Sequence, residues 1–221
     1  MTEAEWLADT DPMPMLEFVR GKASDRKVRL FAVGCCQQLM PWNQNERVSE
    51  ALIRAERYAE GELADATMEK WCQELNRISF RIRQSMGGGG SAQTVICNAV
   101  NCACLPKRYM GVIHTWEALV NLGGVFGSDF PDRGRTIVHA LMNDLFGNPF
   151  RPVAVEPAWL TSTVVALAEG IYQDRAFDRL PILGDALMDA GCDNSDVLNH
   201  CRSDGPHVRG CWVVDLLTGR K

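Results

Sequence analysis

The sequence contains no apolar run of the roughly 18 residues that a membrane-spanning helix needs. Its beginning, "MTEAEWLADTDP", carries acidic residues at once and does not follow the basic-then-apolar plan of a secretory signal. It also has no run of lysines and arginines of the kind that follows a phosphate backbone, and the formal net charge is -5. We therefore expect a cytoplasmic protein that binds neither membranes nor, directly, nucleic acids.

The alternation of apolar and polar residues that marks a half-buried strand is missing as well. Apolar residues recur instead at the helical spacing of three and four, for example at Val28, Phe31, Ala32 and Cys35. The chain is therefore predicted to be all-α, an irregular bundle or array of about ten amphipathic helices.

Polar caps and helix-stopping residues predict where several of these helices begin and end. Thr2 with Glu5 has the form of a capping box, and Ser24, Thr161 and Asp178 precede helical patterns as N-caps. Further helices are expected over residues 135–146 and 206–218.

Two stretches interrupt the helical pattern. Four consecutive glycines, Gly87–Gly90, cannot belong to a regular helix, so a flexible joint at Gly87–Ser91, native or engineered, is expected. Residues 148–159 contain three prolines and are expected to be extended. One domain over residues 1–221 is predicted, with a soft subdivision into 1–86, 91–146 and 147–221 as the alternative.

Nine cysteines are many for a chain of 221 residues, but their number is odd and no CxxC pair occurs. In a reducing compartment, most are expected to be small buried hydrophobic residues. This interpretation extends to the middle group, Cys97, Cys102 and Cys104, where metal or redox chemistry is the alternative.

The tail of the chain concentrates residues that bind metals. Its candidate ligands are Cys192, His200, Cys201, His207 and Cys211. Zinc prefers four nitrogen or sulfur ligands in a tetrahedron, and His207 and Cys211 lie one turn apart if the segment is helical. Cofactors other than such a zinc ion are not expected. The opposing hypothesis is that these cysteines fill a core.

Three residues of this tail spaced four apart, His207, Cys211 and Asp215, suggest a thiol enzyme as a second alternative. Cys211 would be the nucleophile, His207 its base and Asp215 the group that orients the base. Parallel side chains on one helix rarely converge as such a mechanism requires, and Val208, Trp212 and Leu216 lie on the same helical stripe. No spacing in the chain matches an established catalytic or cofactor-binding motif, so whether the protein is an enzyme stays open, with a non-enzymatic role favoured.

Both ends of the chain resemble an uncharacterised bacterial family with many paralogues. The head carries "MTEAEWL" and "SDRKVRLFA", and the tail carries "FGNPFRP" and "HVRGCWVVDLL". In that family a stereotyped head and tail flank a variable helical middle. The resemblance implies no activity, cofactor or site residue, because none is known for the family; variable middles would suit a recognition role.

The leading functional hypothesis is a protein that acts through protein–protein contacts, as an adaptor, regulatory or accessory subunit of a larger complex. Phe146, Phe150 and Arg151 are the candidate anchors, since aromatic residues and arginine are enriched at interfaces. The alternative is that both phenylalanines fold back onto the core. A nucleic-acid-associated accessory role through the arginines of residues 77–83 is the third hypothesis, which the acidic net charge disfavours.

Overall fold

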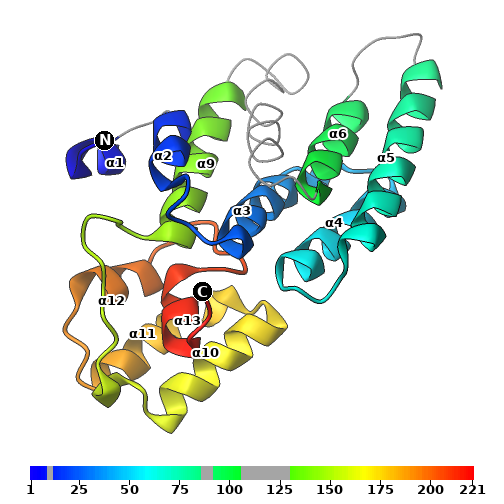
Figure 1. Cartoon of the computed structure of the whole chain (residues 1–221). Coiled ribbons are helices and arrows are strands. Elements are labelled where there is room, and N and C mark those ends of the chain that lie inside the picture. Colours follow the sequence, from blue (N-terminus) through cyan, green and yellow to red (C-terminus); the bar gives the residue numbers. More distant parts are fainter. Residues whose placement is uncertain (9–11, 86–91, 106–129) are drawn as a thin grey trace. The chain divides into compact units, whose positions relative to one another are not determined.

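The computed structural model describes residues 1–8, 12–85, 92–105 and 130–221 (Figure 1). Within these ranges it contains eleven α-helices, three short 3-10 helices and no β-strand, which confirms the all-α prediction. None of the helices in these ranges combines the length and apolar character that crossing a membrane requires. The predicted joint at Gly87–Ser91 lies outside the described residues.

The chain divides into two compact units. The terminal unit consists of Met1–Asp9 and Ala140–Lys221, and the middle unit consists of Thr10–His139. The division therefore falls inside helix α9 (Phe130–Phe146), whereas the subdivision considered from the sequence places its boundaries at the glycine joint and at residue 147.

The middle unit is built from helices that pack on their sequence neighbours. The elements are α2 (Pro12–Val19), α3 (Asp25–Gln37), η1 (Met40–Trp42), α4 (Glu46–Ala59), α5 (Asp65–Ser85) and α6 (Ala92–Cys104), followed by the beginning of α9. Helix α6 packs against α3, α4 and α5, and α4 packs against α3 and α5. Ser24 caps α3 as predicted, because its side chain accepts a hydrogen bond from the Lys27 backbone N–H.

All nine cysteines are free thiols, and in the middle unit only Cys102 is partly exposed. Burial raises the pKa of the Cys72 thiol and that of the Cys97 thiol to about 11. These thiols therefore stay protonated at neutral pH and fill the core like small apolar side chains, as the sequence suggested.

The terminal unit is a second helical array around its own core. After α1 (Glu3–Ala8) and the end of α9 come η2 (Pro157–Trp159), α10 (Ser162–Asp174), η3 (Phe177–Arg179), α11 (Leu180–Asp189), α12 (Ser195–Cys201) and α13 (Trp212–Thr218). Helix α10 packs against α11 and α13, and α12 packs against α11 and α13. Thr2 and Glu5 form the predicted capping box, with the Thr2 N–H donating to Glu5 over 2.6 Å and the Glu5 N–H donating to Thr2 over 3.3 Å.

A buried tryptophan joins α1 to the rest of the terminal unit. The Trp6 side chain is fully buried, and its indole N–H donates to Asn143 Oδ1 and to the Gly147 carbonyl, both at 3.1 Å. Both acceptors belong to the end of α9 and the residue that follows it, so the first helix of the chain is attached to residues more than a hundred positions away.

The prediction of a helix over residues 206–218 was wrong in its first half. Helix α13 begins only at Trp212, and residues 203–211 form a non-helical connection from α12. Gly210 has a φ of 91°, a left-handed conformation that interrupts a right-handed helix. His207, Cys211 and Asp215 therefore do not form one helical row.

Two helix starts also differ from prediction. Helix α9 begins at Phe130 instead of residue 135, since Pro131 is acceptable at the start of a helix. Asp178 is not the N-cap of α11, because it lies within the short 3-10 helix η3 and Arg179 occupies the cap position without a side-chain hydrogen bond.

Candidate metal centre

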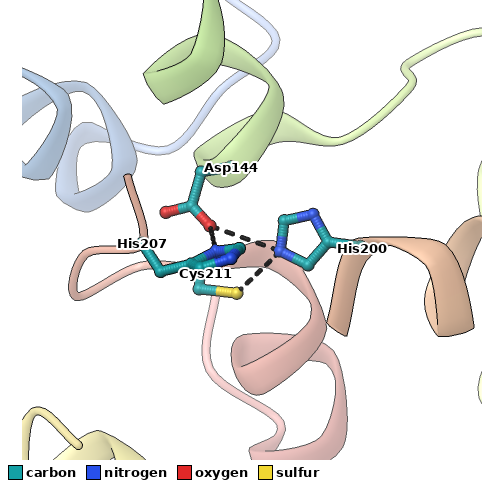
Figure 2. Close-up of side chains that lie close together, drawn as sticks. All are labelled: Asp144, His200, His207 and Cys211. Atoms are coloured by element: carbon teal, nitrogen blue, oxygen red, sulfur yellow. Dashed lines mark hydrogen bonds and ion pairs between the residues drawn. The ribbon is translucent and has the colours of Figure 1, made fainter. Parts of the chain in front are cut away.

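Four side chains of the terminal unit converge on one buried point (Figure 2). Asp144 comes from the last turn of α9, His200 from α12, His207 from the connection after α12, and Cys211 from the position just before α13. One donor atom from each side chain lies within 4.8 Å of the other three.

Asp144 is the hub of this cluster and is only 2% exposed. Its Oδ1 lies 2.7 Å from His207 Nδ1 and 3.2 Å from His200 Nε2, while its Oδ2 accepts the Val208 backbone N–H over 3.0 Å. Burial by itself would raise the pKa of the Asp144 carboxyl group. The hydrogen bonds and positive charge of the two histidines outweigh burial and hold this pKa below its ordinary value, so the group is a carboxylate.

Both ring nitrogens of His207 face acceptors. Nδ1 faces Asp144, and Nε2 lies 3.1 Å from the Ser203 carbonyl oxygen. Burial lowers the pKa of His207, but its bonds to Asp144 and Ser203 raise it by more, so the net shift is upward. Two acceptors suit an imidazolium, which donates from both nitrogens.

A single atom of His200 lies close to both Cys211 and Asp144. Its Nε2 lies 3.1 Å from Cys211 Sγ and 3.2 Å from Asp144 Oδ1. In a nucleophile–base–carboxylate relay, the thiol and the carboxylate contact opposite ring nitrogens. One nitrogen that faces both groups is instead the arrangement of ligands around a common centre.

Cys211 is fully buried. Burial, followed by the negative charge of Asp144, raises the pKa of its thiol well above the ordinary value, although the Val213 and Val214 backbone amides act in the opposite direction. Without a cation at the centre, Cys211 is therefore a neutral thiol, and an activated thiolate is not supported.

The local sequence explains why these side chains are held together. Gly147 has a φ of 61°, which strains any residue with a side chain, and a Cβ placed there would lie 3.1 Å from the Trp212 ring and force the ring to shift by a few tenths of an ångström. Trp212 in turn makes an edge-to-face contact with His200, with 5.4 Å between the ring centroids. The Asn194 side chain caps α12 by accepting the N–H groups of Asp196 and Val197, which sets where His200 falls on that helix.

Three of the five residues singled out as metal ligands in the sequence are brought together here, namely His200, His207 and Cys211. The other two, Cys192 and Cys201, are not members of the cluster, although they pack in the same apolar core as Cys211. Burial raises the pKa of Cys201 to about 12, and that of Cys192 is also raised, so both are ordinary core thiols. Asp215 is buried as well, but it is not a member of the cluster.

The sequence interpretation missed Asp144, although a signal for it was present. Val138, Leu141, Met142 and Leu145 are the buried residues of this part of α9, and Asp144 lies among them at helical spacing. A carboxylate on an apolar stripe requires a partner, because burying it alone is costly.

No protein-family model, no curated protein and no solved structure matches this chain. The interpretation of the cluster therefore depends on its own geometry, and the resemblance of the two ends to a bacterial family stays a prediction.

Proposed function

We propose that this protein binds one zinc ion through Asp144, His200, His207 and Cys211. The observation that carries the proposal is the approach of four donor atoms, from three residue types that ligate metals, to within 4.8 Å of one another.

The donors are close enough to gather on a zinc ion by side-chain shifts of up to about 1 Å, since all of them lie within 4.8 Å of one another. With ligand distances of about 2.0 to 2.3 Å, tetrahedral zinc holds its donor atoms roughly 3.3 to 3.8 Å apart. His200 Nε2 lies 3.1 Å from Cys211 Sγ and 3.2 Å from Asp144 Oδ1, so it needs to move by only a few tenths of an ångström. The shortest pair, His207 Nδ1 and Asp144 Oδ1 at 2.7 Å, would separate when the ion replaces the proton that they share.

The chemistry of the donors favours zinc over the common hard cations. Calcium and magnesium prefer oxygen ligands, whereas this set has one carboxylate oxygen, two imidazole nitrogens and one sulfur. A ligating histidine commonly donates its second N–H to a carbonyl, and His207 Nε2 already faces the Ser203 carbonyl. Asp144 Oδ2 is held by the Val208 N–H, which leaves Oδ1 for the ion.

The role that we propose for the ion is structural. Four protein donors complete a tetrahedron and leave no position for a reacting water molecule. Such an ion would link the end of α9 to α12 and to the beginning of α13, across the non-helical connection that contains His207. It would therefore fix a segment of the terminal unit that has no regular hydrogen-bonded structure of its own.

Metal analysis of protein purified without chelators tests the proposal. We expect about one zinc ion per chain in the wild type, a loss of zinc in Cys211→Ser and no loss in the matched control Cys192→Ser, whose cysteine lies in the core. Cobalt substituted for zinc should give thiolate-to-metal absorption that Cys211→Ser lacks. A wild-type protein that holds no zinc after supplementation, and that gives no cobalt–thiolate absorption, would refute the proposal.

We also propose that the protein acts through contacts with other proteins in the cytoplasm, as an adaptor or accessory subunit. This second proposal is supported by a cavity whose wall includes Phe146 and Arg151, two of the anchors predicted from the sequence. Phe146 and Phe150 are half-buried, and Arg151 is exposed. Size-exclusion chromatography with chemical crosslinking in a lysate tests it, and a strict monomer with no reproducible partner would count against it.

A further inference from the structure

A cavity of about 150 Å³ opens in the terminal unit beside the candidate metal centre. Pro149, Pro152 and Trp212 give it apolar walls, and Arg151 and Asp196 bring a cation and an anion to it. Trp212 directly follows the candidate ligand Cys211, so the cavity and the metal centre share one segment of chain, although the cavity contains none of the four candidate ligands.

The two charges in this cavity are not equivalent. The Nε of Arg151 pairs with Glu3 Oε1 at 2.5 Å, so this cation has a counter-charge within the protein. Among the described residues, none pairs with the carboxylate of Asp196 or donates a hydrogen bond to it. The uncompensated charge in the cavity is therefore negative.

The apolar walls suit the stem of a long cationic side chain. The Trp212 ring lies against Gly147 and contacts the His200 ring, so it is held in place while it lines the cavity. An ammonium group near an indole ring gains from the negative face of the ring, and it gains further from a nearby carboxylate. The proline rings offer apolar surface on which methylene groups can pack.

We infer that this cavity receives a lysine side chain from a partner protein. The cavity is small, about 150 Å³, and lysine carries a compact ammonium group on a flexible apolar stem, whereas arginine carries a wider planar guanidinium group. An acidic side chain would face the carboxylate of Asp196, and the net charge of -5 attracts a basic partner at long range.

The inference extends the second proposal above, because a partner must supply the lysine, but it does not depend on zinc. A small probe tests the cavity by itself. N-acetyl-lysine methylamide is titrated into the full chain, and the indole N–H signal of Trp212 is followed by NMR after its assignment with Trp212→Phe. We expect a saturable shift in the millimolar range, and no shift with the same probe acetylated on its side-chain amine.

Three variants test how each charge at or near the cavity affects the affinity for the lysine probe. Asp196→Asn should weaken binding by about threefold or more, because the counter-charge is lost. The neighbouring Asp193→Asn should leave binding unchanged, since Asp193 does not line the cavity. Arg151→Gln should not weaken binding, because the charge of Arg151 is paired with Glu3 and does not hold the ammonium group.

Several results would overturn the inference: no saturable shift with the lysine probe, an equal shift with the acetylated probe, or unchanged affinity in Asp196→Asn. The zinc content of each variant is measured in parallel, so that damage to the metal centre is not mistaken for loss of the cavity. Because the probe is a single amino acid derivative, failure to find a natural partner leaves this result intact.

Discussion

Replacing Asp144 by asparagine removes the charge at the hub of the four-residue cluster while preserving the size of the side chain. The remaining amide oxygen can still accept the Val208 N–H, which now binds Asp144 Oδ2 over 3.0 Å. The new amide N–H₂ group, however, would occupy the position of Oδ1, which faces nitrogens of both His207 and His200. Two charge-assisted contacts are lost, and the new amide N–H₂ group then faces the ring nitrogens that now donate to the carboxylate.

The expected cost follows from the number and type of these contacts. Hydrogen bonds to charged groups contribute about 1.5 to 3 kcal/mol each, and breaking one partner of a buried charged pair costs about 3 to 5 kcal/mol. His207 can release its proton once the carboxylate is gone, and this relieves part of the cost. We therefore expect Asp144→Asn to lower the free energy of unfolding by about 3 kcal/mol in metal-free protein.

Urea unfolding followed by far-UV circular dichroism, at pH 7 with a chelator, measures this change. The matched control is Asp185→Asn, the same substitution at a side chain that is 70% exposed and pairs with Arg202 at 3.2 Å. The control should lose no more than about 1 kcal/mol. If both variants lose the same amount, the reasoning about a stabilising buried network is wrong. With zinc at 100 times its dissociation constant, the wild type should gain about 2.7 kcal/mol, and Asp144→Asn should gain clearly less.

Three further predictions concern pH, backbone strain and thiol reactivity. The pKa of His207 is raised in the folded protein, so the contribution of its protonated form to stability is complete below about pH 6.5 and is lost as the pH rises through the folded-state pKa. In metal-free protein, urea unfolding should therefore give a larger difference in the free energy of unfolding between the wild type and His207→Gln at pH 6 than at pH 9. Gly147→Ala should lower the free energy of unfolding more than Gly61→Ala in the same assay. Both glycines have a positive φ, which costs alanine about 1 to 2 kcal/mol, but only Gly147 also abuts the Trp212 ring. Equal losses of stability would show that this contact carries no energy. Native protein treated with iodoacetamide at neutral pH should be labelled at Cys102 before the fully buried Cys211, as read by peptide mass spectrometry, and rapid labelling of Cys211 would restore the thiol-enzyme hypothesis.

Features set by a few neighbouring residues were predictable from the sequence. The caps at Ser24 and Thr161 depend on a side chain and a backbone N–H three positions apart, and both are present. The late start of α13 was not predicted, because apolar residues continue at helical spacing through Val208 and Cys211. Only the positive φ of Gly210 reveals the break, and a sequence pattern does not contain it.

The candidate site shows the same limit at longer range. His200, His207 and Cys211 lie within twelve positions of one another, so their proximity is nearly local. Asp144 reaches them only because residues 147–159 carry the chain away from α9 and α10–α12 bring it back, and that depends on tertiary packing. A buried acid at position 144 indicated that some partner was needed, but not which one.

The attachment of Trp6 to the end of α9 has a consequence for the order of folding. Residues 1–9 can join their unit only after the ribosome has produced the residues around position 147, with roughly 130 residues of the middle unit in between. Closing a loop of that length costs about 4 kcal/mol in chain entropy if the loop is disordered. A middle unit that folds first is more compact than a disordered chain of the same length, which lowers the entropic cost of bringing residues 1–9 to the end of α9. We therefore expect the middle unit to assist assembly of the protein during synthesis, even though it supplies none of the four residues at the candidate metal centre.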